Sequence, residues 1–344
     1  MNSADIPHSS LDSSPSRSKS FIRIIGKILV ATVLLYLASR YLIFWQGWPS
    51  LGESIQALTG SSEAGKDSSK LYKGIALLMA YLTVFVFIII RVSKTPNTTL
   101  TADSNTYRDL AFYIIRAAFW AVFLVGLADT VISLLRVENY LEALVGTSIS
   151  DTMGLATKRG YYVHYPLITI SFVIAWFSKS LGFTWLAFLV VLSEFFIVLT
   201  RFIFSYEQAY MGDLVRFWYA ALFLFASAYT LYDNGHVRVD VLYARFKPRK
   251  KAWVNALGTL LLGLPLCWTI LHYGIGTKYS NLISPIITFE ISQSGYGLYV
   301  KYLMAGFLIV FAVTMAIQFV SLFLSSCAYL FNEKDAPQPA GGEH

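Results

Sequence analysis

The sequence predicts an all-α integral membrane protein, a bundle of about eight transmembrane helices. Of the 344 residues, 56% are hydrophobic and 14% are charged, whereas soluble domains carry about 25% charged residues. The apolar residues gather in runs of roughly twenty, the length that a helix needs to cross the hydrocarbon core of a bilayer. These runs lack the alternation of barrel strands, and only helices or closed barrels can span lipid. Basic residues lie between the runs, so the net charge of +7 indicates membrane topology and no nucleic acid partner.

Eight candidate spans follow one another along the chain. In order they are Ile24–Trp45, Leu71–Val92, Leu110–Leu135, Tyr162–Phe177, Phe183–Phe204, Leu214–Tyr232, Trp253–Tyr273 and Tyr299–Leu324. The first follows a basic segment, as the core of a signal peptide does, but it is longer than the roughly 7–15 residues of a cleavable core. We therefore expect it to remain as a span. The fourth is short, and seven spans remain an alternative.

The distribution of lysine and arginine predicts which side of the membrane each loop faces. With eight spans and a cytoplasmic N-terminus, the cytoplasmic loops and tails receive the greater share of these residues, as the positive-inside rule requires. Omitting the fourth span would place the basic segment 238–251 opposite the basic N-terminus. We therefore prefer eight spans, with both termini in the cytoplasm.

Composition and span order divide the chain into four segments. Residues 1–20 are rich in serine and are predicted to be a disordered cytoplasmic tail. Residues 21–180 form an N-terminal membrane extension with about four spans, and residues 183–330 hold four more. Residues 331–344 form a second cytoplasmic tail. The two membrane segments share no sequence repeat, which disfavours a carrier that works alone through inverted repeats.

The segment 206–246 is the most informative stretch. Its charged start holds Glu207, Asp213 and Arg216, and the last two are three residues apart, so they can meet on one helix face. The following apolar run stops at Gly235, a residue typical of helix C-termini. Both ends can be read as ordinary charged surface or as contact sites for partners. The candidate contact or structural residues are Glu207, Asp213, Arg216, Gly235, His236, Arg238 and Asp240.

Among the ionisable residues inside or at the end of apolar runs, Glu194, Arg201 and Asp129 are the polar candidates. Glu194 lies near the middle of its span, where a carboxylate is costly and usually faces protein or a water-filled cavity. Arg201 lies on the same helix face, about 10 Å along the axis, so a direct pair needs extended side chains or a water molecule. Asp129 interrupts the third span. Each carboxylate fits either ion coupling or a contact between helices.

No catalytic, metal or cofactor motif is apparent. The sequence contains no phosphate-binding loop, dinucleotide fingerprint, nucleophile elbow or zinc-protease motif. We therefore expect no enzymatic activity and no cofactor. The alternative is a membrane electron carrier or enzyme with a haem or quinone site, built from His164, His272, Glu194 or Asp129.

The order of these signals resembles the small membrane subunit of tripartite ATP-independent periplasmic (TRAP) transporters. The similarity covers about residues 183–330. It rests on the pair Arg201-Phe202 closing one span, the acidic Glu207, the signature Gly235-His236-Val237-Arg238-Val239-Asp240 closing the next, and the turn Gly295-Tyr296-Gly297-Leu298-Tyr299-Val300-Lys301 before the last. The N-terminal extension is a departure, because the usual small subunit lacks it.

The resemblance implies a non-enzymatic subunit of a bacterial inner-membrane transporter. Such a subunit scaffolds a large membrane subunit that moves the substrate, and it helps to dock a periplasmic binding protein. The substrate is typically an organic anion such as a carboxylate, taken up by symport with sodium ions or protons and without ATP. The resemblance does not specify the substrate or the coupling ion.

Overall fold

The computed structural model describes residues 17–59, 68–206, 208–233, 242–292 and 297–338. Within these ranges all regular secondary structure is helical, which confirms the predicted fold class. Eight of the described helices are long and apolar enough to cross a membrane, and the fourth, Ala156–Phe177, is among them. The choice of eight spans over seven is therefore supported by the helices themselves.

The helices follow the predicted order along the chain, with short helices in the connections. Their bounds are α1 Arg17–Gln46, α2 Leu51–Leu58, α3 Ser68–Lys94, α4 Leu100–Val137, α5 Tyr140–Val145, α6 Thr147–Met153, α7 Ala156–Arg159, η2 Gly160–His164, α8 Tyr165–Phe177, α9 Phe183–Ile203, α10 Ala209–Tyr232, α11 Pro248–Gly258, η3 Thr259–Gly263, α12 Leu264–Ile275, α13 Ile283–Thr288 and α14 Lys301–Leu330. The elements η2 and η3 are π-helical turns that join α7 to α8 and α11 to α12.

Helix α4 is longer than the predicted third span, because polar residues extend it beyond the apolar run. It begins at Leu100, where the Thr99 side chain accepts a hydrogen bond from the backbone N–H of Ala102 at 3.1 Å. Asp103 in the first turn faces the positive end of the helix dipole. The helix ends before Asn139, which adopts a left-handed conformation with φ of 59°. Its 38 residues give a length of about 57 Å, more than the hydrocarbon core.

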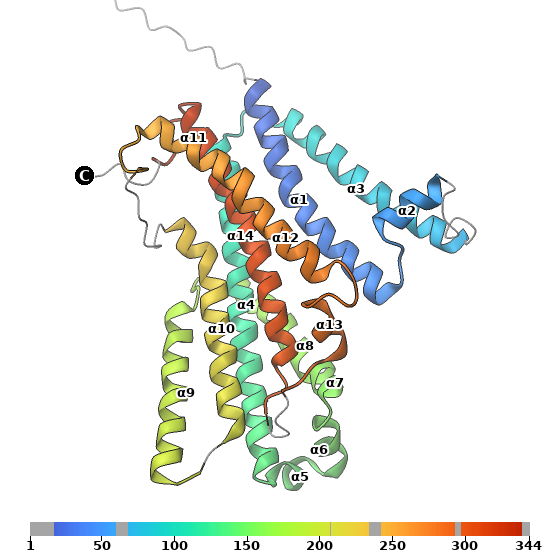
Figure 1. Ribbon diagram of the computed structural model, residues 1–344, viewed down its shortest axis with the longest axis vertical. Coiled ribbons are helices and arrows are strands. Elements are labelled where there is room, and N and C mark those ends of the chain that lie inside the picture. The colour runs from blue at the N-terminus through green and yellow to red at the C-terminus, as the bar shows by residue number, and fades with distance from the viewer. Residues whose placement is uncertain (1–16, 60–67, 207, 234–241, 293–296, 339–344) are drawn as a thin grey trace, which may run out of the picture.

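Successive spans run in opposite directions through an elongated bundle. In Figure 1, α1 and α4 begin at the upper end, where α14 finishes, whereas α5, α6 and the turn between α9 and α10 lie at the lower end. We call these the upper and lower ends of the bundle. The first and last described parts of the chain therefore lie at the same end.

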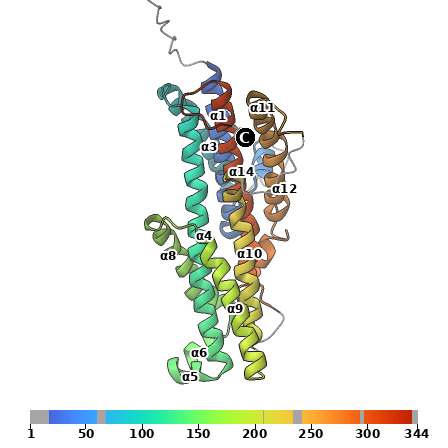
Figure 2. The ribbon, with the colours of Figure 1, turned by 90° about the vertical axis from the view of Figure 1, so that its left-hand side faces the viewer.

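The long helices α4 and α14 form the centre of the bundle. They pack side by side more extensively than any other described pair, and α14 is the most deeply buried of the candidate spans. One apolar cluster joins α14 to α1, α11 and α12, and the other joins it to α4 and α10. Figure 2 shows α4 running along most of the length of the molecule. Helices α1 and α4 of the N-terminal extension thus pack against α14, the last helix of residues 183–330.

At the upper end an ionic cluster joins α1 to α4, and Glu333 connects both helices to the end of α14. Asp103 Oδ2 accepts from Arg23 Nε, and Asp103 Oδ1 from Lys27 Nζ, both at 2.7 Å. Glu333, just after α14, accepts the backbone N–H groups of Leu100 and Thr101, each at 3.1 Å. The carboxylate of Glu333 therefore caps the exposed donors at the N-terminus of α4.

A close approach between α4 and α10 depends on Gly126. A Cβ atom added there would lie 2.6 Å from Trp218 Nε1. The Trp218 indole is buried, and its Nε1 donates to the backbone carbonyl of Val122 at 3.3 Å. Since the indole is rigid and held by this hydrogen bond, even one methyl group at position 126 forces the helices apart.

Replacing Gly126 by alanine is expected to destabilise the protein by about 1–3 kcal/mol, the usual cost of overpacking a core. Thermal unfolding of the detergent-purified protein measures the change. Gly212→Ala in α10 is the matched control, because a Cβ there meets nothing within 4 Å. If both variants unfold at the temperature of the parent protein, the close contact between α4 and α10 does not exist.

Candidate functional site

The lower end of the bundle contains a fully buried polar cluster around Asp129 of α4. Asp129 Oδ1 accepts from Arg159 Nη1 at 2.9 Å and from His164 Nε2 at 3.1 Å. Asp129 Oδ2 accepts the backbone N–H of Tyr299 at 2.7 Å. The side chains of Asp129, Arg159 and His164 are all 0% exposed. A buried carboxylate is tolerable only when it is paired and hydrogen-bonded, and these three donors satisfy it.

The partners of Asp129 are themselves held in place. Arg159 also donates through Nε to the Met153 carbonyl at 2.8 Å, and its guanidinium lies 4.1 Å from the centre of the Tyr299 ring. With His164 Nε2 donating to the carboxylate, Nδ1 of a neutral imidazole accepts from Tyr302 Oη at 2.9 Å. We call Asp129, Arg159, His164, Tyr299 and Tyr302 the lower clasp.

The π-helical turn η2 brings Arg159 and His164 to Asp129. Gly160 starts this turn, and a Cβ atom there would lie 2.4 Å from the Phe289 ring and 3.1 Å from Tyr302 Oη. Glycine therefore allows η2 to approach the first turn of α14. The extra residue of a π-turn shifts the helix face, so that Arg159 and His164 both reach the same carboxylate.

A second carboxylate holds the segment before α14 from the other side. Asp213 of α10 accepts the backbone N–H of Leu298 at 3.2 Å and lies 3.6 Å from Arg216, which is 75% exposed. Asp213 and Arg216 line a surface pocket of about 440 Å³. The other lining residues are Ser292, Leu298, Val300, Lys301 and Met304. Lys301 pairs with Glu290 at 2.6 Å. The pocket thus combines one carboxylate with two cationic side chains.

The connection between α9 and α10 also lies at the lower end and carries a further hydrogen bond. Tyr206 Oη donates to Glu138 Oε1 at 2.7 Å. This hydrogen bond raises the pKa of the Tyr206 hydroxyl above its ordinary value. The contact joins the end of α4 to the connection between α9 and α10.

The other sequence-predicted residues lie elsewhere. Glu194 and Arg201 are both exposed on α9, and the described structure records no ion pair between them. Glu207, Gly235, His236, Arg238 and Asp240 lie outside the described residues, as do Gly295 and Tyr296 of the predicted turn. Asp213 and Arg216 are thus the members of the predicted contact set whose geometry can be stated.

Sequence reasoning missed three members of the lower clasp. Arg159 lies between the third and fourth predicted spans, and Tyr299 and Tyr302 lie at the start of the eighth. Nothing in their spacing connects them to Asp129, because they lie 30, 170 and 173 positions away along the chain. The haem alternative also meets an obstacle here, since both ring nitrogens of His164 already have partners.

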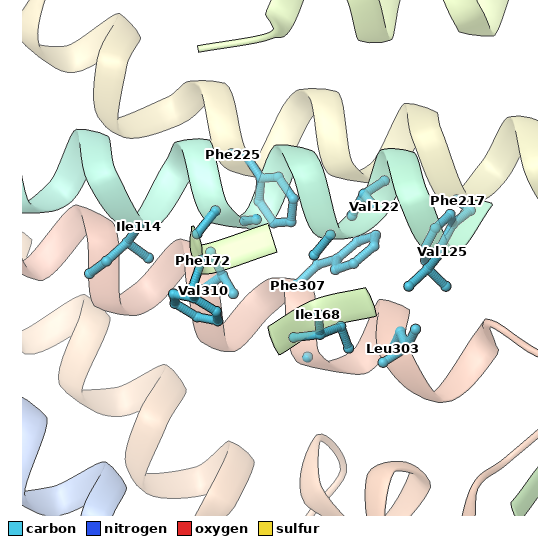
Figure 3. Close-up of a pocket in the computed structure, with 14 residues that line it drawn as sticks. Ile114, Val122, Val125, Ile168, Phe172, Phe217, Phe225, Leu303, Phe307 and Val310 are labelled. Carbon is cyan, nitrogen blue, oxygen red and sulfur yellow. The ribbon is translucent and has the colours of Figure 1, made fainter. Parts of the chain in front are cut away.

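An apolar pocket of about 190 Å³ lies between α4, α8, α10 and α14 (Figure 3). The side chains that point into it include Val122, Phe172, Phe225 and Phe307. All its lining residues are apolar, so it offers no donor or charge for an anionic ligand. The lining also offers a water molecule no hydrogen-bond partner, and we assign this pocket to apolar packing among the four helices.

The fold and these contacts define a polytopic helical membrane protein whose polar residues join helices to one another. Residues 190–327 match the family described as tripartite ATP-independent periplasmic transporters, DctQ component. The match runs from α9 into α14, so this part of the chain is similar to the small permease component of TRAP transporters, and further membrane helices precede it. This family is a transporter component family and not an enzyme family. No curated protein and no solved structure matches the chain.

Proposed function

We propose that this chain scaffolds the large membrane subunit of a bacterial inner-membrane TRAP transporter. That transporter takes up an organic anion of the carboxylate class by symport with sodium ions or protons, without ATP, after a periplasmic binding protein delivers the substrate. The observation that carries the proposal is the family match over residues 190–327. The large subunit and the binding protein are the two partners.

In this proposal both termini are cytoplasmic, so the upper end faces the cytoplasm and the lower end the periplasm. The described basic residues of the upper connections support this orientation under the positive-inside rule. They include Arg91 and Lys94 at the end of α3 and Arg249 and Lys250 at the start of α11. The signature residues Gly235, His236, Arg238 and Asp240 then contact the large subunit at the cytoplasmic surface.

The proposed role of the pocket at Asp213 is to dock the binding protein. Arg216 and Lys301 provide exposed positive charge at its rim, and Asp213 fixes the segment before α14. Rim charges of this kind mainly guide encounter and orientation. Glu207 belongs to the same docking surface in this proposal.

The proposed role of the extension, residues 21–180, is to brace α14. Asp129 of α4 binds the backbone just before α14, and Glu333 just after α14 caps α4. Both ends of the scaffold's central helix are therefore fixed by residues of the extension. Residues 183–330 remain the unit that meets the large subunit.

Affinity purification of the tagged chain from native membranes in a mild detergent tests the proposal. We expect a larger polytopic protein to co-purify, and the reconstituted pair to take up an organic anion when the binding protein and an ion gradient are supplied without ATP. Recovery of the chain alone, or uptake that requires ATP, contradicts the proposal.

Replacing Arg216 by glutamate is expected to reduce uptake at limiting binding-protein concentration by about tenfold, which corresponds to about 1.4 kcal/mol. The new carboxylate faces Asp213 and reverses the charge at the rim of the pocket. Stability should change by less than about 0.5 kcal/mol, as for other exposed substitutions. Lys278→Glu, an exposed cation after α12 that does not line the pocket, is the control. Equal uptake by both variants contradicts the docking role.

A further inference from the structure

Helix α9 is the candidate span whose polar residues are least explained by the rest of the chain. It packs mainly on α10, and its outer side exposes many large apolar residues. Exposed apolar side chains are normal where a helix faces lipid. Two features of this outer side do not fit lipid.

The first feature is Glu194. It lies near the middle of the 21 residues of α9, and its side chain is exposed. Among the described residues it has no hydrogen bond or ion-pair partner, in contrast to Asp129 and Asp103, which are each paired. From mid-depth, water is about 15 Å away, half the hydrocarbon core, which is beyond the reach of a glutamate side chain. A carboxylate in this position needs a partner from outside the chain.

The second feature is a stripe on α9 in which small and β-branched residues are regularly spaced and which also contains Glu194 and Arg201. Thr184, Ala187, Val191, Glu194, Val198 and Arg201 are all exposed and are three or four residues apart in alternation. That is the spacing of the seam of two helices that pack in a left-handed pair. Small and β-branched residues at such a seam let another helix come close. The bulkier exposed residues Phe188 and Phe195 lie beside the seam.

The carboxylate of Glu194 determines which kind of partner can bind at the seam. Lipid tails provide no hydrogen-bond donor for Glu194. A second copy of this chain, inserted in the same orientation, would place its own Glu194 at the same depth and bring two carboxylates together. A different membrane helix with a donor at mid-depth satisfies both the charge and the spacing.

We propose that the α9 seam binds a transmembrane helix of the large subunit, and that this helix carries a lysine, arginine or other donor side chain opposite Glu194. This inference rests on the proposed function and specifies which surface forms the interface. Glu194 is then a contact residue between subunits. Arg201 offers a second polar contact about two helical turns further along the seam.

Photo-crosslinking in native membranes tests the assignment. A benzoylphenylalanine at Val191 or Val198 is expected to form a covalent product with the large subunit, whereas the same group at Phe195, beside the seam, should yield at least tenfold less. Capture of the large subunit by affinity purification, with crosslinks from positions off the seam only, overturns this inference and leaves the proposed function standing. A product with the mass of two copies of this chain also overturns it. If no polytopic protein is captured by either method, the proposed function fails and the inference fails with it.

Substitution at the seam gives a second, independent readout. Glu194→Leu is expected to lower the amount of co-purified large subunit at least tenfold, while Phe195→Leu leaves it unchanged. The isolated Glu194→Leu chain should unfold at or above the temperature of the parent protein, because Glu194 has no described partner to lose. Retention of the large subunit by Glu194→Leu at the parent level contradicts the role of Glu194.

Discussion

Replacing Asp129 by alanine is expected to destabilise the protein by about 3–5 kcal/mol, the cost of leaving a buried ion without its partner. Arg159 is 0% exposed and makes its ion pair with Asp129, so its charge would remain inside the bundle. The backbone N–H of Tyr299 would also lose its acceptor. Thermal unfolding in detergent, followed by size-exclusion chromatography, measures the loss.

Two further variants separate the ion pair from a general effect of mutation. Asp109→Ala removes a carboxylate from the same helix, but that carboxylate is 68% exposed, and we expect a change within about 0.5 kcal/mol. Removing both charges with Asp129→Leu and Arg159→Met should cost less than Asp129→Ala alone, since no unpaired buried charge remains. If the Asp129→Ala variant is as stable as the parent protein, Asp129 and Arg159 are not paired.

A chain that begins at residue 181 is expected to lose a stable folded state in detergent. The shortened chain keeps α9 to α14, but the extension supplies the acceptors for three of its buried donors. Trp218 Nε1, Tyr299 N and Tyr302 Oη would lose Val122, Asp129 and His164. Each unsatisfied group costs several kcal/mol where no water is available, so the combined loss is comparable to the usual stability of a domain, about 5–15 kcal/mol. Size-exclusion chromatography and thermal unfolding measure the result.

Co-expression of residues 1–180 as a separate polypeptide is the control for this truncation. Transmembrane helices insert before they associate, so the two pieces are expected to reassemble and restore a single elution peak. The Asp129→Ala substitution in the separate piece should weaken this rescue. A chain 181–344 that is as stable as the full protein contradicts the bracing role of the extension.

The membrane-spanning helices could be predicted from the sequence because their signal is local. Twenty consecutive apolar residues identify a span wherever they occur, and the short fourth span was recovered from the charge of distant loops. The full extent of the fourth span could not be predicted, because Lys158 and Arg159 interrupt the apolar pattern at the start of that helix. Arg159 is buried against Asp129. This ion pair lowers the free-energy cost of burying the arginine charge.

The sequence alone determined the class of the protein: an all-helical membrane protein with eight spans and the signals of a TRAP small permease component in its C-terminal part. Only the tertiary structure decided which polar residues have partners within the chain. Asp129 and Glu194 are both carboxylates within apolar runs, yet Asp129 meets Arg159, His164 and the backbone of Tyr299, and Glu194 meets none of the described residues. Hydropathy depends on the residue and its immediate neighbours, whereas a hydrogen bond depends on which helices the fold brings together.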